Sequence, residues 1–301
     1  MAMARGQITT DSDKKPATKA HCVNILPNGS SIIDDHRVML PDRSLQDYLV
    51  DKCDISTSVV VPTINGWIES TWKDETGGFT SVSDVFGVPP APTNSGSQVI
   101  FLFDSIQYFG SSSWIVQPVL TWGCAQYVFG LCSLGGSFWW IASWAVFSNG
   151  PSYVTPTFNV SPGDTINGLV VRQASDASCN GQQGYEIRAI DQSAGNTLEH
   201  LTFCNNNIGT EANPGVLEAY GVNSCNDLPA TLSETFQSIS SSPTETTWPG
   251  GVNVGSNVSP QCGYNVPPPT TSTYVILDWL GTSGGGGGGC SPTSASGPNP
   301  C

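Results

Sequence analysis

Apolar and polar residues alternate through most of the chain between Asn65 and Leu280. Alternation with a period of two is typical of a strand with one buried face. Clusters of Gly, Pro, Asn and Ser at 148–151, 161–164 and 193–196 favour turns between such strands. The pattern predicts strands at 98–103, 114–122, 138–147, 153–160, 165–173, 184–191, 197–203, 216–222 and 274–280. Because no long helical pattern accompanies these strands, the sequence predicts an all-β sandwich.

The rest of the chain differs from this region and suggests a simple division. We expect the β-sandwich domain at residues 64–280. Residues 1–20 are polar, charged and without periodicity, so we expect them to be disordered. We interpret residues 21–63 as a leader or pro-segment that packs on a sheet edge or groove, with a short helix at 45–51. Six consecutive glycines predict a flexible tail at 281–301.

The net charge of −14, from 24 acidic and 10 basic residues, excludes several classes of partner. A nucleic-acid-binding surface needs Lys and Arg to neutralise phosphates, and an anionic membrane surface needs the same charges. The most apolar run, Ser137–Phe147, is too short to span a bilayer and predicts either a buried pair of strands or one strand with aromatic faces. We therefore expect a monomer that binds neither nucleic acid nor a membrane.

Ten cysteines are dispersed among turn-rich segments. The chain has no Cys-x-x-Cys pair and three histidines, so we expect no metal or other cofactor. An even cysteine count instead predicts disulfides, with Cys124–Cys132 as a local pair and the other pairings open. Glycosylation acceptor triplets begin at Asn28, Asn159 and Asn257. We expect an extracellular glycoprotein, although residues 1–20 contain no apolar core of a signal peptide.

Four short motifs follow one another along the chain in an order and spacing that a known family shares. They are Phe79-x-x-Val82-x5-Val88-Pro89, Trp114-Ile-Val-Gln117, Phe158-Asn-Val-Ser-Pro-Gly163-Asp164 and Val216-Leu-Glu218-Ala-Tyr220. Through these motifs, residues 65–222 resemble the fungal glutamic peptidases called eqolisins. The resemblance implies a concanavalin A-like β-sandwich of two bent antiparallel sheets. It also implies that the segments at 98–103, 114–122, 165–173 and 216–222 are neighbours in one sheet.

The same resemblance implies a catalytic pair formed by Gln117 and Glu218. In that family the glutamate activates a water and then donates a proton to the leaving amine, while the glutamine positions the water and supports the oxyanion. A neutral amide donates a hydrogen bond without adding a charge that would perturb the glutamate. We therefore expect a secreted acid endopeptidase with a polypeptide substrate, whose two side chains approach within hydrogen-bond or one-water reach.

Four further residues are candidates for lining a substrate groove: Gln107, Asp104, Trp122 and Trp144. Gln107 stands where the family has a supporting aspartate, and the acidic residue of the family's Trp-Tyr-Glu-Trp stretch is missing beside Trp144. Asp104 is equally well interpreted as a turn residue. The tryptophans are more often found in the core between two sheets.

Other functions remain compatible with the sequence. A Gln or Glu in an alternating strand is ordinarily an outward-facing residue without chemistry, and the same scaffold hosts non-catalytic carbohydrate-binding proteins and polysaccharide-cleaving enzymes. A glycosidase needs paired carboxylates, and no pair adjacent in the sequence beyond Asp74-Glu75 suggests one. Asp34-Asp35-His36 offers metal-ligand atoms, but a solvated charge cluster is the interpretation we prefer.

Overall fold

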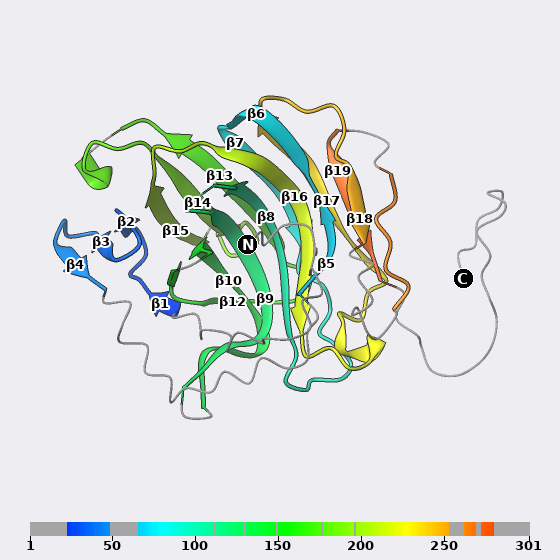
Figure 1. Cartoon of the computed structure of the whole chain (residues 1–301). Helices are drawn as coiled ribbons and strands as arrows, with labels where there is room; N and C mark the ends of the chain where they lie inside the picture. The colour runs from blue at the N-terminus through cyan, green and yellow to red at the C-terminus, as the bar shows by residue number, and fades with distance from the viewer. Residues whose placement is uncertain are drawn as a thin grey trace, which may run out of the picture.

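Two large β-sheets face each other in the computed structural model and form a sandwich (Figure 1). The structure describes residues 23–48, 66–110, 112–128, 131–148, 150–175, 177–195, 197–252, 262–268 and 272–279. Within these ranges the helices are two 3-10 turns, η2 Ala177–Cys179 and η3 Cys225–Asp227. No helix in this part of the chain is long and apolar enough to cross a membrane. The predicted all-β sandwich is confirmed.

The first sheet, here called sheet A, has the strand order β1-β11-β10-β9-β8-β16-β5-β18, with β12 paired to β10 and β6 to β16. Its pairs are antiparallel except for β1–β11. Its strands are β1 Val23–Ile25, β5 Gly66–Thr71, β6 Lys73–Phe79, β8 Val99–Tyr108, β9 Trp114–Val128, β10 Leu131–Phe147, β11 Ser152–Val154, β12 Phe158–Val160, β16 Gly209–Tyr220 and β18 Gly250–Val252.

The second sheet, here called sheet B, has the order β19-β17-β7-β13-β14-β15-β2-β3-β4. Its pairs are antiparallel except for β2–β15. Its strands are β2 Ser31–Ile32, β3 Arg37–Met39, β4 Leu45–Asp47, β7 Ser81–Gly87, β13 Thr165–Gln173, β14 Gly184–Asp191, β15 Thr197–Cys204, β17 Ser233–Ser242 and β19 Tyr274–Asp278.

Sheet membership corrects one expectation. The segments predicted at 98–103, 114–122 and 216–222 are β8, β9 and β16, which lie side by side in sheet A. The segment at 165–173 is a strand with the predicted bounds, but it is β13 in sheet B, so its placement beside the other three was wrong. A period of two identifies a half-buried strand and says nothing about which sheet the strand joins.

Residues 23–48 extend both sheets at the same end of the sandwich (Figure 1). β1 adds to sheet A beside β11, while β2 adds to sheet B beside β15 and continues into β3 and β4. The expected helix at 45–51 is wrong where the structure describes it, because Leu45–Asp47 pairs with β3 as a strand. Residues 49–63 lie outside the described residues, so a leader or pro-segment role stays a prediction.

The main core lies between the sheets. Inward-pointing residues alternate along the strands, as with Val116 and Leu120 on β9 and Ile166 and Val170 on β13. Each apolar side chain of this kind, fully buried, contributes about 1.5–3 kcal/mol to folding. The apolar run at 137–147 lies within one strand, β10, so the interpretation as a single strand is correct and the strand pair is wrong.

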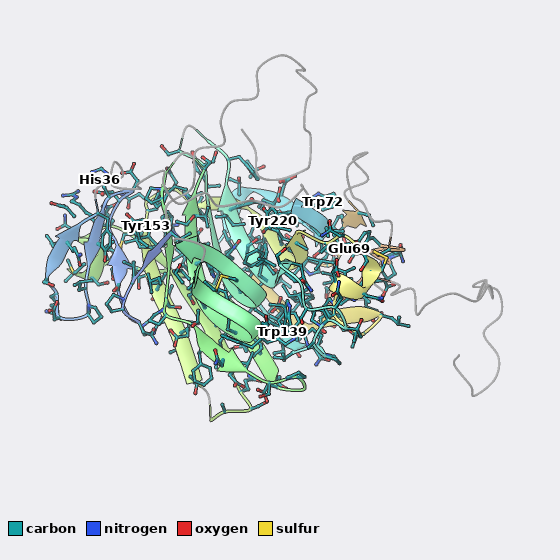
Figure 2. The ribbon with its side chains drawn as sticks, turned by 90° about the horizontal axis from the view of Figure 1, so that it is seen from below. His36, Glu69, Trp72, Trp139, Tyr153 and Tyr220 are labelled. Carbon is teal, nitrogen blue, oxygen red and sulfur yellow. A yellow bond between two sulfur atoms is a disulfide. The ribbon has the colours of Figure 1, made fainter. Side chains whose placement is uncertain are left out.

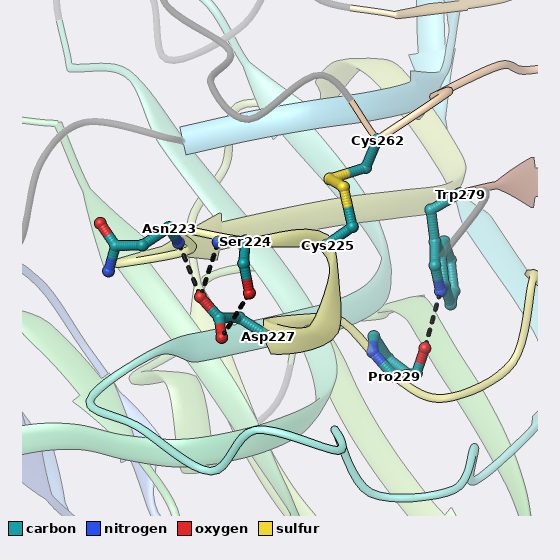
Figure 3. Close-up of a disulfide and its surroundings, with 7 residues drawn as sticks. All are labelled: Asn223, Ser224, Cys225, Asp227, Pro229, Cys262 and Trp279. Carbon is teal, nitrogen blue, oxygen red and sulfur yellow. Dashed lines mark hydrogen bonds between the residues drawn. A yellow bond between two sulfur atoms is a disulfide. The ribbon is translucent and has the colours of Figure 1, made fainter. Parts of the chain in front are cut away.

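The described residues form three disulfides: Cys124–Cys132 joins β9 to β10, Cys179–Cys204 joins η2 to β15, and Cys225–Cys262 joins η3 to the segment between β18 and β19. The first is the predicted local pair. The third fixes the loop that follows β16 (Figure 3), where the Asp227 carboxylate also accepts hydrogen bonds from the backbone N–H groups of Asn223 and Ser224. The other four cysteines, the triplet at Asn257 and the glycine run lie outside the described residues.

Candidate active site

A second apolar cluster lies on the side of sheet A that faces away from the core, and we call this side the outer face. Alternate residues on each strand separate the two sides. On β8, for example, Leu102 belongs to the core and Phe103 to the outer cluster. The outer cluster contains Phe103, Ile115, Val119, Leu134, Trp140, Ala142, Trp144, Val154 and Val216, with Trp67 and Phe101 partly buried against it.

Four predicted site residues lie on this outer face, and three of them, Gln117, Trp144 and Glu218, adjoin the apolar cluster. Gln117 stands between Ile115 and Val119 on β9, so it shares their side of the sheet. Trp144 on β10 is directly opposite Gln117. Glu218 follows Val216 by two residues on β16 and therefore projects from the same face.

Two other predicted site residues point the opposite way, which corrects the expectation that they line a groove. Trp122 belongs to the core between the sheets, where its ring lies 5.5 Å from that of Trp139 in a T-shaped contact. Asp104 is fully buried beside Asp84 of sheet B. Trp122 is an odd number of residues from Gln117, and Asp104 is one residue from Phe103, so strand alternation sends both inward.

Glu218 lies half-buried among aromatic side chains. Its cross-strand neighbours are Phe101 on β8 and Trp67 on β5. The hydroxyl of Tyr220 (labelled in Figure 2) donates a hydrogen bond to Oε1 of Glu218, and the Trp67 side chain donates a second one. Burial raises the pKa of Glu218 to about 7, and the two hydrogen bonds act against that rise. The carboxyl therefore changes charge near neutral pH.

Aromatic rings connect the surroundings of Glu218 with those of Gln117. The Phe101 ring makes T-shaped contacts with Tyr220 on one side and Trp144 on the other, each with centroids 6.3 Å apart. Trp144 in turn stands opposite Gln117. A buried apolar cluster on the outer face therefore lies between a carboxyl at one end and an amide at the other.

The structure does not bring Gln117 and Glu218 into hydrogen-bond contact. Glu218 is opposite Phe101 on β8, whereas Gln117 is opposite the stretch between Phe103 and Ile106. The two residues are therefore separated by two strand spacings across the sheet and by about four residues along the strands. In a flat sheet this corresponds to a distance on the order of 15 Å between their Cα atoms. The Gln117 amide makes no side-chain hydrogen bond to any described residue. Their approach through a water or a bound substrate stays a prediction.

A second polar group, which the sequence did not reveal, surrounds Gln107 on the same face. The Gln107 amide donates hydrogen bonds to Glu211 and, at 3.0 Å, to Oδ1 of Asn213. The Asn213 amide donates to Glu211 at 2.9 Å. Burial raises the pKa of Glu211 to about 7, and contact with Asp74 adds to the rise. Gln107 is only 1% exposed, so it supports this network and does not present itself to a substrate.

Two partners of Glu218 also escaped the sequence reasoning. Tyr220 was detectable, because a residue two positions from Glu218 on a strand must share its face. Trp67 gave no such signal, since about 150 residues separate it from Glu218 and only the β5–β16 pairing joins them. Strand pairing over such separations is not encoded in local alternation.

The adjacent residues Asp34, Asp35 and His36 have ligand atoms within 4.8 Å of one another. The group lies in the turn between β2 and β3, apart from Tyr220 on the outer face (both His36 and Tyr220 are labelled in Figure 2). Asp34 is already paired with Arg37, 2.5 Å from Nη2, and His36 with Asp35. These charges satisfy one another as a surface cluster.

Comparison with known proteins finds no matching family model and no matching curated protein. Similar solved structures include scytalido-glutamic peptidase with a peptide-based transition-state analogue, at 15% identity, a TM-score of 0.47 and coverage of 71% of this chain and 98% of that chain. SCP-B, a member of the eqolisin family of peptidases in complex with the tripeptide Ala-Ile-His, has 14% identity, a TM-score of 0.46 and coverage of 71% and 98%. The CBM2 module of the evolved Dit of Lactobacillus casei BL23 phage J-1 has 12% identity, a TM-score of 0.29 and coverage of 67% and 89%. These low values leave the functional case to the residues of this chain.

Proposed function

We propose that this chain is a secreted endopeptidase of the glutamic type, in which Glu218 is the general base and then the general acid. The observation that carries the proposal is the setting of its carboxyl. It is half-buried on an apolar face, it accepts hydrogen bonds from two aromatic side chains, and its pKa is raised to about 7 by burial. A group with that pKa both accepts and donates a proton efficiently near neutral pH.

The reaction follows from the charge states of this carboxyl. The ionised Glu218 takes a proton from water while the water oxygen bonds to the peptide carbonyl carbon, and the carbonyl electron pair moves to its oxygen. The protonated Glu218 then gives that proton to the amide nitrogen as the C–N bond breaks. Gln117, whose amide has no partner among the described residues, supplies a neutral hydrogen bond to the substrate.

The raised pKa changes the expected working range. A general base must be ionised, so the rate should increase with pH through about 7, where half of the Glu218 carboxyls are ionised, and level off above it. The optimum should therefore lie above the acid range that the family resemblance implied. The sequence motifs support the type of reaction, and the surroundings of Glu218 in this chain determine the pH range of the proposed activity.

An extracellular location accords with the three disulfides of the described residues, because disulfides persist in oxidising compartments. Both acceptor asparagines in the described residues, Asn28 and Asn159, are exposed, and the one at Asn159 is the better glycosylation site because the side chain of Asn28 is engaged in hydrogen bonds. The amide of Asn28 instead donates to the carbonyl of Leu198 at 2.6 Å.

The proposal is tested by comparing the wild type with Glu218→Gln on an unfolded protein substrate between pH 4 and pH 8. We expect the wild type to produce internal cleavages and the variant to produce none, because an amide of the same shape cannot accept the proton of water. Glu75→Gln is the matched control, since Glu75 lies on β6 and should not affect cleavage. Equal inertness of wild type and Glu218→Gln, with binding to polysaccharide instead, would favour the carbohydrate-binding alternative.

A further inference from the structure

The hydroxyl of Tyr220 makes a contact that the two-residue reaction scheme does not use. Tyr220 follows Glu218 by two residues on β16, so both side chains project from the outer face. Its hydroxyl donates to Oε1 of Glu218 from the same strand, while the Trp67 side chain donates from β5. The carboxyl is thus held by two different strands.

These two donors favour one charge state of Glu218. A hydrogen bond from a neutral donor is stronger to a carboxylate than to a protonated carboxyl. Burial acts in the opposite direction, because the apolar surroundings favour the uncharged acid. Tyr220 itself stays protonated, since the Glu218 charge and burial raise its pKa well above the usual value. It is therefore a donor throughout the pH range in which Glu218 ionises.

We propose that Tyr220 is a positioning residue for Glu218, whose hydroxyl fixes the carboxyl in one orientation on the outer face and keeps it ionised in apolar surroundings. The catalytic meaning of this role rests on the proposed function, whereas the effect on the carboxyl does not. Tyr220 gives up no proton during the reaction. The proton that Glu218 removes from water is the one that reaches the leaving amine.

The other neighbours of this carboxyl leave Tyr220 as the one titratable group that acts on it. Phe101 faces Glu218 from β8 and Trp67 faces it from β5, and neither carries a charge. Among the described residues, no charged side chain shifts the pKa of Glu218. A change at Tyr220 is therefore reported by the titration of Glu218 without interference from another charge.

The experiment uses Tyr220→Phe in the full chain, which keeps the ring beside Phe101 and removes only the hydroxyl. The carboxyl titration is followed by NMR with ¹³C-labelled glutamate, and the signal of Glu218 is assigned by its loss in Glu218→Gln. We expect the pKa of Glu218 to increase by about one unit, because the lost hydrogen bond stabilised the ionised form. In peptide hydrolysis, kcat should fall with KM nearly unchanged, and the acid limb of the pH profile should move upward by the same amount.

Tyr108→Phe is the matched control, since it removes a hydroxyl from β8 far along the strand from Phe101 and should leave the Glu218 titration unchanged. An unchanged Glu218 titration in Tyr220→Phe overturns the proposal even if activity falls, because a packing defect also lowers activity. A shifted titration in a chain without peptidase activity supports the role of Tyr220 and refutes the peptidase. The two proposals therefore fail in different measurements.

Discussion

Two aspartates between the sheets should make the fold less stable as pH rises. Asp84 on β7 and Asp104 on β8 are fully buried, and none of their four carboxyl oxygens accepts a hydrogen bond from another residue in the described part of the chain. Both point at Gly168 on β13: a Cβ atom there would lie 2.0 Å from Oδ1 of Asp104 and 3.1 Å from Oδ1 of Asp84. Burial raises the pKa of both carboxyls well above the usual range, and the charge of Asp104 raises that of Asp84 further.

The sign of the effect follows from the raised pKa values. In the unfolded chain both carboxyls lose their protons near pH 4, whereas the folded chain retains them to higher pH. The contribution of these two carboxyls to the free energy of unfolding is fully present below pH 4. It is lost as the pH rises toward their pKa values in the folded chain. Each retained proton costs about 1.4 kcal/mol of unfolding free energy per pH unit for as long as the folded chain holds it. A loss of that size per pH unit is a large part of the stability of a typical domain, about 5–15 kcal/mol.

Asp104→Asn removes one of these protons while preserving the shape of the side chain. We expect the free energy of unfolding to fall with pH less steeply than in the wild type, by at least about 1.4 kcal/mol per pH unit. Urea unfolding followed by tryptophan fluorescence between pH 4 and pH 7 measures both slopes. Other carboxyls with raised pKa values, such as Glu69 at about 9 and Glu234 at about 7, contribute equally to both proteins and cancel in the difference.

The control is Asp47→Asn, because Asp47 is exposed on β4. The slope of its unfolding free energy against pH should match that of the wild type. If Asp104→Asn also keeps the wild-type slope, the two aspartates do not carry protons in the folded state, and the reasoning from their burial is refuted.

Two further outcomes are expected. Gln117→Ala should lower kcat for peptide hydrolysis by about 10²–10³-fold, the usual effect of losing one oxyanion donor; a change confined to KM would assign Gln117 to substrate binding alone. Replacing Cys225 and Cys262 together by serine should lower the free energy of unfolding by about 3–4 kcal/mol in chemical denaturation, because it releases a long loop; an unchanged midpoint would show that the loop is held by its other contacts.

Local alternation predicted individual strands well and their arrangement poorly. β13 and β14 have the predicted bounds, because turn residues bracket a regular alternation on both sides. β17 was missed, since its sequence SETFQSISSS buries Phe236 and Ile239 among serines and resembles a loop. Pairing partners far apart in the chain, such as β5 with β16, depend on packing that no local window records.

The same distinction applies to the site. Gln117, Trp144 and Glu218 share one face as the motifs suggested, because each occupies the correct position in its own alternation. Asp104 and Trp122 were misplaced although the signal was available. An odd separation along a strand, between Gln117 and Trp122 for instance, puts two side chains on opposite faces. The approach of Gln117 to Glu218 depended on register across β8, which the sequence does not contain.

The position of Glu218 in β16 makes the proposed activity sensitive to the parity of insertions and deletions. β16 is paired along both edges, with irregularities in register between Asn213 and Val216 and between Leu217 and Glu218. If the pairing of the residues before it is kept, loss of one residue between Asn213 and Leu217 would turn Leu217 outward and the carboxyl of Glu218 inward. Loss of two residues would return Glu218 to the outer face and shift only its position along the strand. A library of length variants across this strand should therefore retain function with a period of two, and homologous chains should differ here by even numbers of residues.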